Sequence, residues 1–206
     1  MTDIGLEQGE EDMPLRALPV GSPGRKSSGW LGMMTLIVTE ASLFLYLLFS
    51  YFYFAIWSEG GFLPKDLPKF NLSGPDTVIL LLSSVAVWWG EKGARVGCRR
   101  QLSLGLVGGI VLGAIFVGVQ LLEWAGKPYR INTSAYGSLY FTITGFHLAH
   151  VVVGMAGLVV LLVWSLLGYF DAQRHAPVAI GAVYWHFVDA VWLAVFFTIY
   201  VSPHLG

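Results

Sequence analysis

Six side chains that can exchange a proton or bind a metal stand in otherwise apolar stretches of this sequence. They are Glu40, Glu123, His147, His150, His186 and Asp189. An ionisable group at the depth of a lipid bilayer is costly unless it is paired, hydrated or neutral. The residue types allow three kinds of chemistry: proton transfer, metal or haem ligation, and structural hydrogen bonding.

Glu40 is the only charged residue between Trp30 and Trp57. It lies ten residues past Trp30, which is roughly 15 Å along a helix and therefore near the middle of a bilayer. Desolvation at that depth disfavours the carboxylate. We expect a neutral, hydrogen-bonded acid, and a proton carrier or a group facing a polar cleft are the functional alternatives.

The histidines form two short patterns. His147 and His150 are three residues apart, as are His186 and Asp189, so each pair shares one face of a helix. The second pair can form an internal hydrogen bond that satisfies two buried polar groups. A haem held by two histidines needs both at one depth. Counted from the expected helix ends, His150 lies about 27 Å and His186 about 12 Å along its helix, so we predict no metal or haem in this chain.

The composition indicates what positions these residues. Of 206 residues, 55% are hydrophobic and only 12% are charged, whereas soluble domains carry about 25% charged residues. The pattern predicts an all-α integral membrane bundle of five transmembrane helices. The expected spans are about 30–57, 76–97, 101–124, 134–168 and 177–203. A net charge of −1 excludes a general nucleic-acid binder. Nucleotide-binding, nucleophile-elbow and zinc-protease motifs are absent from the sequence.

The second span has the weakest pattern, since its uncharged stretch, residues 77–90, is only 14 residues long. We expect this helix to start at Pro75 and Asp76, with Asp76 capping the free amides. A re-entrant segment is the alternative. The third span carries Gly105, Gly109 and Gly113 at four-residue spacing, a pattern that lets another helix approach closely.

The basic residues predict the orientation. Residues 1–29 form a polar arm that is too poor in apolar residues to fold alone. This arm and the loops 91–101 and 169–177 hold eight Lys and Arg, against four on the other side of the membrane. The excess predicts a cytoplasmic N-terminus, a cytoplasmic Cys98 and a periplasmic C-terminus.

Three segments resemble subunit III of the haem–copper respiratory oxidases. Residues 184–193, YWHFVDAVWL, resemble the WHFxDxxW signature of that family, and residues 136–154 resemble its YGS…GFHxxHVxxG pattern. Glu40, within Thr39-Glu40-Ala41, matches the buried membrane glutamate, and residues 120–124, QLLEW, fit the helix end before the YGS loop. The resemblance runs in order over about residues 30–202.

The resemblance implies a subunit without haem or copper of its own. Such a subunit packs against the haem–copper catalytic subunit I in a V-shaped arrangement, holds phospholipid in a cleft and supports proton uptake. Longer members have seven spans, and this chain lacks the first two. Five-span forms are typical of bacteria, so we expect a multi-pass protein of the bacterial inner membrane.

Other functions stay open at this point. An accessory subunit of a quinol oxidase or nitric oxide reductase is the nearest alternative. An independent proton-coupled transporter would use Glu40, Asp189 and the histidines, but the sequence has no visible inverted repeat. A membrane haem b protein is disfavoured by the mismatch in histidine depth.

Overall fold

The computed structural model describes residues 28–58, 61–64 and 70–204. Within them lie five helices that are long and apolar enough to cross a membrane, which confirms the predicted all-α fold. They are α1 (Ser28–Trp57), α2 (Phe70–Arg95), α3 (Arg99–Ala125), α4 (Ala135–Leu167) and α5 (Ala176–Phe196). The proposed N-terminal arm, residues 1–29, lies almost entirely outside the described residues, and its separation from the membrane domain stays a prediction.

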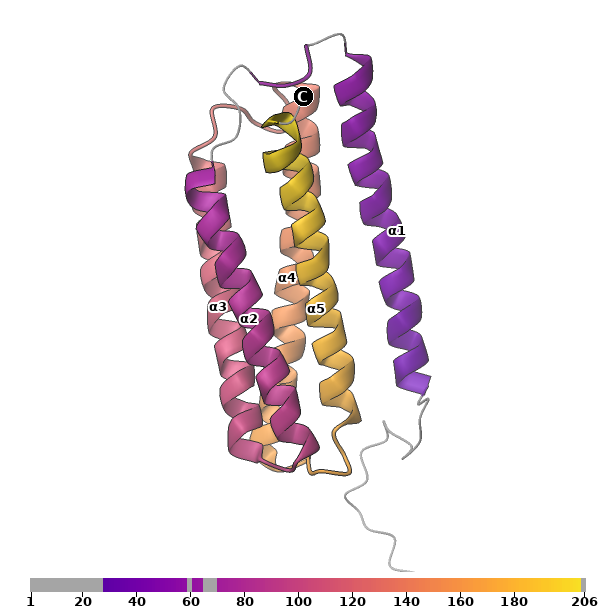
Figure 1. Ribbon diagram of the computed structural model, residues 1–206, viewed down its shortest axis with the longest axis vertical. Coiled ribbons are helices and arrows are strands. Elements are labelled where there is room, and N and C mark those ends of the chain that lie inside the picture. The colour runs from indigo at the N-terminus through magenta and orange to yellow at the C-terminus, as the bar shows by residue number, and fades with distance from the viewer. Residues whose placement is uncertain (1–27, 59–60, 65–69, 205–206) are drawn as a thin grey trace, which may run out of the picture.

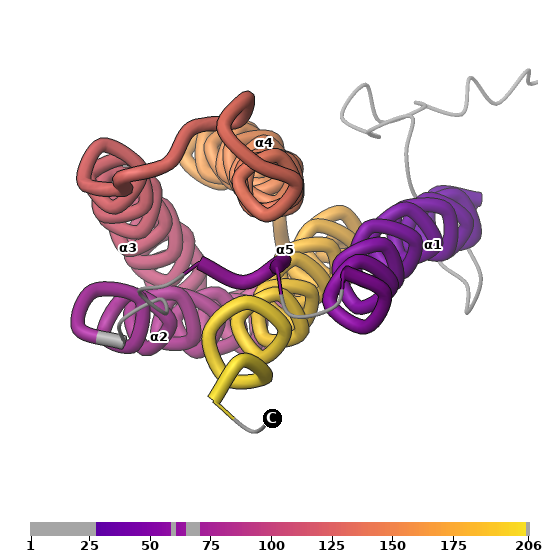
Figure 2. The backbone as a smooth tube through the Cα atoms, turned by 90° about the horizontal axis from the view of Figure 1, so that it is seen from above, coloured from indigo at the N-terminus to yellow at the C-terminus, as the bar shows by residue number. Residues whose placement is uncertain are grey.

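The helices run up and down, so that consecutive helices are antiparallel (Figure 1). Helices α2 to α5 form a four-helix bundle, and α1 lies along its outside against α4 and α5 (Figure 2). The turn between α2 and α3 meets the turn between α4 and α5, because Gly97 lies beside Ala172 and Gly168 beside Arg99. These turns and the start of α1 therefore share one end of the molecule.

Helix α2 is longer than the sequence predicts. It begins at Phe70, so Pro75 is the sixth residue of the helix. Because proline has no amide hydrogen, the helical hydrogen bond from position 75 to the Asn71 carbonyl cannot form. The prediction that Asp76 caps this helix is wrong: Asp76 is an interior residue, and its side chain is completely buried. With 26 residues, or roughly 39 Å of helix, α2 is long enough for a full crossing rather than a re-entrant segment.

Local sequence signals set the ends of the last two helices. Ser134 caps α4 by accepting a hydrogen bond from the Gly137 amide at 3.0 Å, and Gly168 ends it with a φ of 84°, a left-handed conformation that favours glycine. The last predicted span is not one regular helix. Helix α5 continues as η1 (Phe197–Val201), a π-helical turn, and η2 (Ser202–His204), a 3-10 turn.

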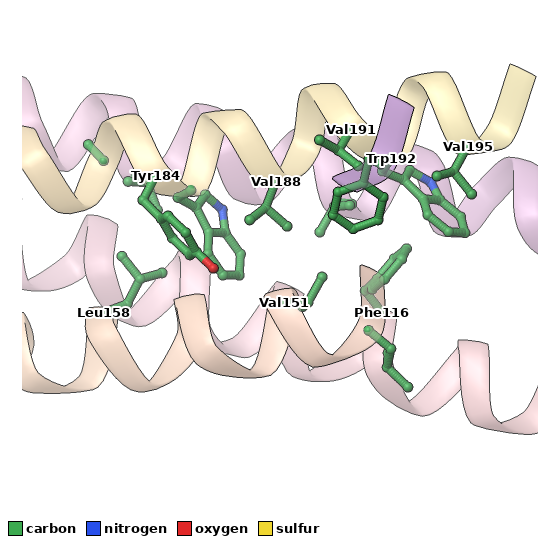
Figure 3. Packing of buried hydrophobic residues seen from close by; sticks show 14 of the residues in the cluster. Phe116, Val151, Leu158, Tyr184, Val188, Val191, Trp192 and Val195 are labelled. Carbon is green, nitrogen blue, oxygen red and sulfur yellow. The ribbon is translucent and has the colours of Figure 1, made fainter. Parts of the chain in front are cut away.

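Close backbone approach holds the bundle together. A Cβ atom added to Gly105 would lie 2.5 Å from the Gly90 Cα, so only glycine allows α2 and α3 to pack this closely. The Trp185 indole packs on Gly113 of α3 and Gly154 of α4. Further along α5, Trp192 packs edge-to-face on Phe116 of α3 (Figure 3).

We predict that Gly105→Ala destabilises the bundle, because the new methyl group meets the backbone of α2 and the helices must separate. We expect a cost of about 1–3 kcal/mol, typical of overpacking, measured as a lower thermal midpoint by circular dichroism in detergent. The matched control is Gly118→Ala on the same helix, since nothing lies within 4 Å of the added Cβ. Equal midpoints for the two variants would contradict the prediction.

Candidate functional site

A cleft of about 620 Å³ separates the first half of α1 from α4 and α5. Its walls are mostly apolar, with contributions from Met33, Leu36, Val153 and Leu161. The second half of α1 packs tightly on the bundle, since Phe44 and Tyr51 are buried there. Helix α1 therefore diverges from the bundle towards the end that carries the α2–α3 turn.

Glu40 and His150 face each other in the wall of this cleft. The His150 Nε2 lies 2.9 Å from the Glu40 Oε2, and the His150 Nδ1 lies 2.6 Å from the Phe146 carbonyl oxygen. A carbonyl only accepts hydrogen bonds, so Nδ1 must carry a proton. Two states then allow a hydrogen bond to Glu40. In the neutral imidazole, Nε2 accepts a hydrogen bond from a protonated Glu40; in the imidazolium, Nε2 donates one to the Glu40 carboxylate. In both states the pair has no net charge.

The structure changes the expectation for Glu40 in one respect. The sequence offered no partner within its own span, but α4 supplies His150 across the cleft. The Phe44 ring lies edge-on against the His150 ring, with centroids 5.1 Å apart, and this contact fixes the imidazole beside α1. An acid that is isolated in the sequence thus becomes one half of an interhelical pair.

His147 does not line the cleft, although it shares a helix with His150. It is buried among Phe44, Phe116 and Trp192, and its Nε2 donates to the Val188 carbonyl at 3.2 Å. This bond fixes the neutral tautomer with the proton on Nε2. The contacts indicate a core histidine that joins α4 to α5.

His186 and Asp189 do not form the internal pair that their spacing predicts. The His186 Nδ1 lies 2.5 Å from the Ser84 hydroxyl on α2. Asp189 is buried, and its carboxylate interacts with the same Ser84 hydroxyl. Two further hydrogen bonds join α5 to α2. The Trp185 indole donates to the Ser83 hydroxyl and the Trp192 indole donates to the Thr77 hydroxyl, each at 3.0 Å. The polar residues of the WHFxDxxW-like segment and its two tryptophans thus face α2.

Glu123 belongs to a buried cluster at the opposite end of the bundle. It forms an ion pair with Lys127 at 2.7 Å and accepts a hydrogen bond from the Tyr200 hydroxyl at 2.7 Å. The Tyr200 hydroxyl also lies 3.2 Å from that of Tyr140. The π-helical turn at the end of α5 carries Tyr200, so this irregular turn places the phenol on the carboxylate.

Sequence reasoning missed Asp76 and Gln120 as members of this region. Both side chains are buried. The Asp76 carboxylate has no hydrogen-bond partner among the described residues, whereas Gln120 interacts with the Tyr140 hydroxyl. Asp76 on α2 interacts electrostatically with Glu123 on α3. The available signal was a carboxylate inside an apolar stretch, but its position after Pro75 favoured a helix start.

Haem or metal ligation finds no support in the described part of the chain, where no three histidine, cysteine or acidic side chains come together as a metal site. His150 and His186 each have a different polar partner on another helix. The predicted residues therefore fall into separate interhelical contacts rather than one catalytic centre.

The profile of the family described as "Cytochrome c oxidase subunit III" matches residues 26–203. The chain belongs to this family. It is 34% identical over 178 residues to the cytochrome c oxidase subunit 3 of Marchantia polymorpha, an alignment that covers 82% of this chain and 66% of the relative. The subunit 3 proteins of Scyliorhinus canicula, over 178 residues, and Arabidopsis thaliana, over 181, are each 33% identical, with 82% of this chain covered in both and 67% and 66% of the relatives.

Family membership identifies a membrane subunit of the respiratory oxidase type, and the five long apolar helices identify a multi-pass membrane protein. The family carries no redox centre itself. The chain spans about two thirds of the length of the relatives that it matches. The GFHxxH-like segment supplies His150 to the cleft, and the WHFxDxxW-like segment supplies Trp185 and Trp192 to the contact between α2 and α5.

We predict that the shared proton of the cleft pair resides on Glu40, because an apolar environment disfavours separated charges even when they are paired. Infrared spectroscopy should then show a protonated-carboxyl band that is lost in Glu40→Gln. The band should persist at a shifted frequency in His150→Leu, which removes only the hydrogen-bond partner.

Glu123→Gln is the control for this measurement, because Glu123 faces the Lys127 ammonium and should contribute no protonated-carboxyl band. A wild-type spectrum that is indistinguishable from that of Glu40→Gln would instead place the proton on His150.

Proposed function

We propose that this chain is the non-catalytic subunit III of a bacterial haem–copper terminal oxidase. Its role is to stabilise the catalytic subunit, to hold phospholipid in the cleft between α1 and the bundle, and to support proton uptake during oxygen reduction. Haem and copper belong to the partner subunit. The observation that carries the proposal is the apolar cleft with the Glu40–His150 pair in its wall, in a chain of the subunit III family.

The cleft suits the acyl chains of a phospholipid. It is open, about 620 Å³ in volume and mostly apolar, and burial of apolar surface is the main driving force for such a ligand. A charged group in its wall would oppose lipid chains, but the Glu40–His150 pair has no net charge. The pair thus combines a site that can hold a proton with a surface that tolerates lipid.

The partners of the membrane histidines favour a structural role for this chain over a redox role. Copper and haem sites need histidine, cysteine or methionine ligands that converge on one point. The three membrane histidines of this chain have other partners: Glu40 for His150, a backbone carbonyl for His147 and Ser84 for His186.

The arrangement of the helix ends supports an orientation with the N-terminus in the cytoplasm. The start of α1 lines the same cleft as the start of α5, through Gly29 and Pro177. This end also carries Arg99, Arg100 and Arg174, and basic residues accumulate on the cytoplasmic side. With this proposed orientation, the cleft mouth in a bacterium faces the side from which protons are taken up.

We predict that a membrane-impermeant maleimide does not label Cys98 in intact cells but labels it in inverted vesicles. Cys98 is a free, exposed thiol in the α2–α3 turn. The control is Asn132→Cys in a Cys98→Ser background, since Asn132 is exposed at the opposite end and should be labelled from outside. Labelling of Cys98 in intact cells would reverse the proposed orientation.

We predict that deletion of the chain shortens the working life of the oxidase more than it slows the first turnovers. A subunit that holds lipid against the catalytic subunit protects it over time without taking part in electron transfer. The measurement is oxygen consumption per haem at early and late times, in membranes from deletion and complemented strains.

Two results would overturn the proposed function. One is an assembled oxidase with unchanged rate and unchanged inactivation after deletion. The other is purification of the tagged chain in mild detergent without a haem–copper subunit. Co-purification with a quinol oxidase or a nitric oxide reductase would replace the proposed partner by that complex.

A further inference from the structure

A second groove lies beside the segment that joins α3 to α4, at the end of the molecule opposite the cleft mouth. Figure 1 shows this segment at the same end of the bundle as the end of α5. Its volume is about 720 Å³. Its lining includes aromatic, basic and amide side chains: Trp124, Lys127, Tyr129, Arg130, Asn132 and Phe141. None of the described residues that line the groove is acidic.

The groove carries a net positive charge. Lys127 is already paired with Glu123, so its charge is largely balanced from inside the bundle. Arg130 is exposed, and no carboxylate of the described residues lies within ion-pair distance of its guanidinium. Burial raises the pKa of Tyr129 to about 12, so this phenol stays neutral and does not offset the charge.

One wall of the groove is aromatic. The Trp124 and Phe141 rings pack edge-to-face with centroids 5.7 Å apart, and Tyr129 lies 6.3 Å from Phe141. The Trp124 indole nitrogen is already used, since it donates to Thr144 at 3.2 Å. The wall therefore presents ring surfaces rather than free hydrogen-bond donors.

The backbone that carries Arg130 is held firmly in place. The Arg130 amide donates to the Thr133 hydroxyl at 3.0 Å, and the same hydroxyl donates back to the Arg130 carbonyl at 2.8 Å. Ser138 donates to the Ile131 carbonyl at 2.5 Å. A Cβ atom on Gly137 would lie 2.5 Å from the Arg130 carbonyl oxygen, so glycine is required for this approach. The YGS-like motif thus fixes the position of Arg130.

We propose that this groove binds the headgroup of an anionic phospholipid. The phosphate lies against the Arg130 guanidinium, with the Asn132 amide beside it, and the first part of the acyl chains lies on Trp124 and Phe141. Arginine suits this role because its planar group forms paired hydrogen bonds with phosphate oxygens.

The position of the groove favours a lipid over a soluble anion. Helix α3 ends at Ala125 and α4 begins at Ala135, so the groove lies where the helices leave the apolar part of the membrane and headgroups reside. A soluble phosphate would use Arg130 but leave the aromatic wall exposed. The site is separate from the cleft of α1, α4 and α5, which opens at the other end and is lined by different residues.

The test is native mass spectrometry of the full chain in a non-ionic detergent, titrated separately with phosphatidylglycerol, phosphatidylcholine and inorganic phosphate. The variant is Arg130→Gln, and the matched control is Arg100→Gln, an exposed arginine at the opposite end. We expect Arg130→Gln to retain one fewer phosphatidylglycerol, with an affinity for that lipid lower by about tenfold or more, the loss of one charge-assisted contact. The control should bind as the wild type does.

A photoactivatable phosphatidylglycerol locates the lipid independently. We expect crosslinks to residues 124–141 in the wild type and their loss in Arg130→Gln, while crosslinks to the α1 cleft persist. Unchanged binding and crosslinking in Arg130→Gln would overturn the proposal, as would equal affinity for phosphatidylcholine. Displacement of the lipid by inorganic phosphate at the same concentration would assign the groove to free anions and overturn the lipid assignment.

Discussion

Inside a membrane, a helix satisfies its own backbone, so polar side chains must find their partners on neighbouring helices. This constraint determines which helices of this protein lie together. Each helix of the bundle is joined to another by at least one side-chain hydrogen bond. The pairs include Glu40–His150 between α1 and α4, Ser103–Ser165 between α3 and α4, Ser84–His186 between α2 and α5, and Glu123–Tyr200 between α3 and the turn after α5.

Glycine makes these contacts possible. Gly105 allows α2 and α3 to approach until their backbones touch, and Gly113 and Gly154 leave space for the Trp185 indole. Van der Waals packing replaces the hydrophobic effect between helices in lipid, so small residues on the inner faces have the structural role that large apolar residues have in soluble proteins. Large apolar side chains cover the outer faces instead, most completely on α1.

The charged residues at the two ends of the molecule have different environments. At the cleft, Glu40 and His150 share a proton and remain neutral as a pair in an apolar wall. At the other end, Glu123 forms an ion pair with Lys127, and Arg130 is exposed with no carboxylate of the described residues beside it. A neutral wall suits acyl chains and a positive rim suits a phosphate, so the same chain offers lipid a different surface at each side of the membrane.

The sequence by itself determined the five helices, the end of α4 at Gly168 and the glycine face of α3, because these depend on local composition and on the conformational freedom of glycine. It also carried the family motifs. The tertiary structure alone decided the partners. His150 for Glu40 and Ser84 for His186 come from other helices, and the spacing within one helix, which favoured Asp189 for His186, contains no information about neighbours. Asp76 was misplaced for the same reason: a proline followed by an acid is a start signal locally, but packing against α3 and α5 extends the helix past it.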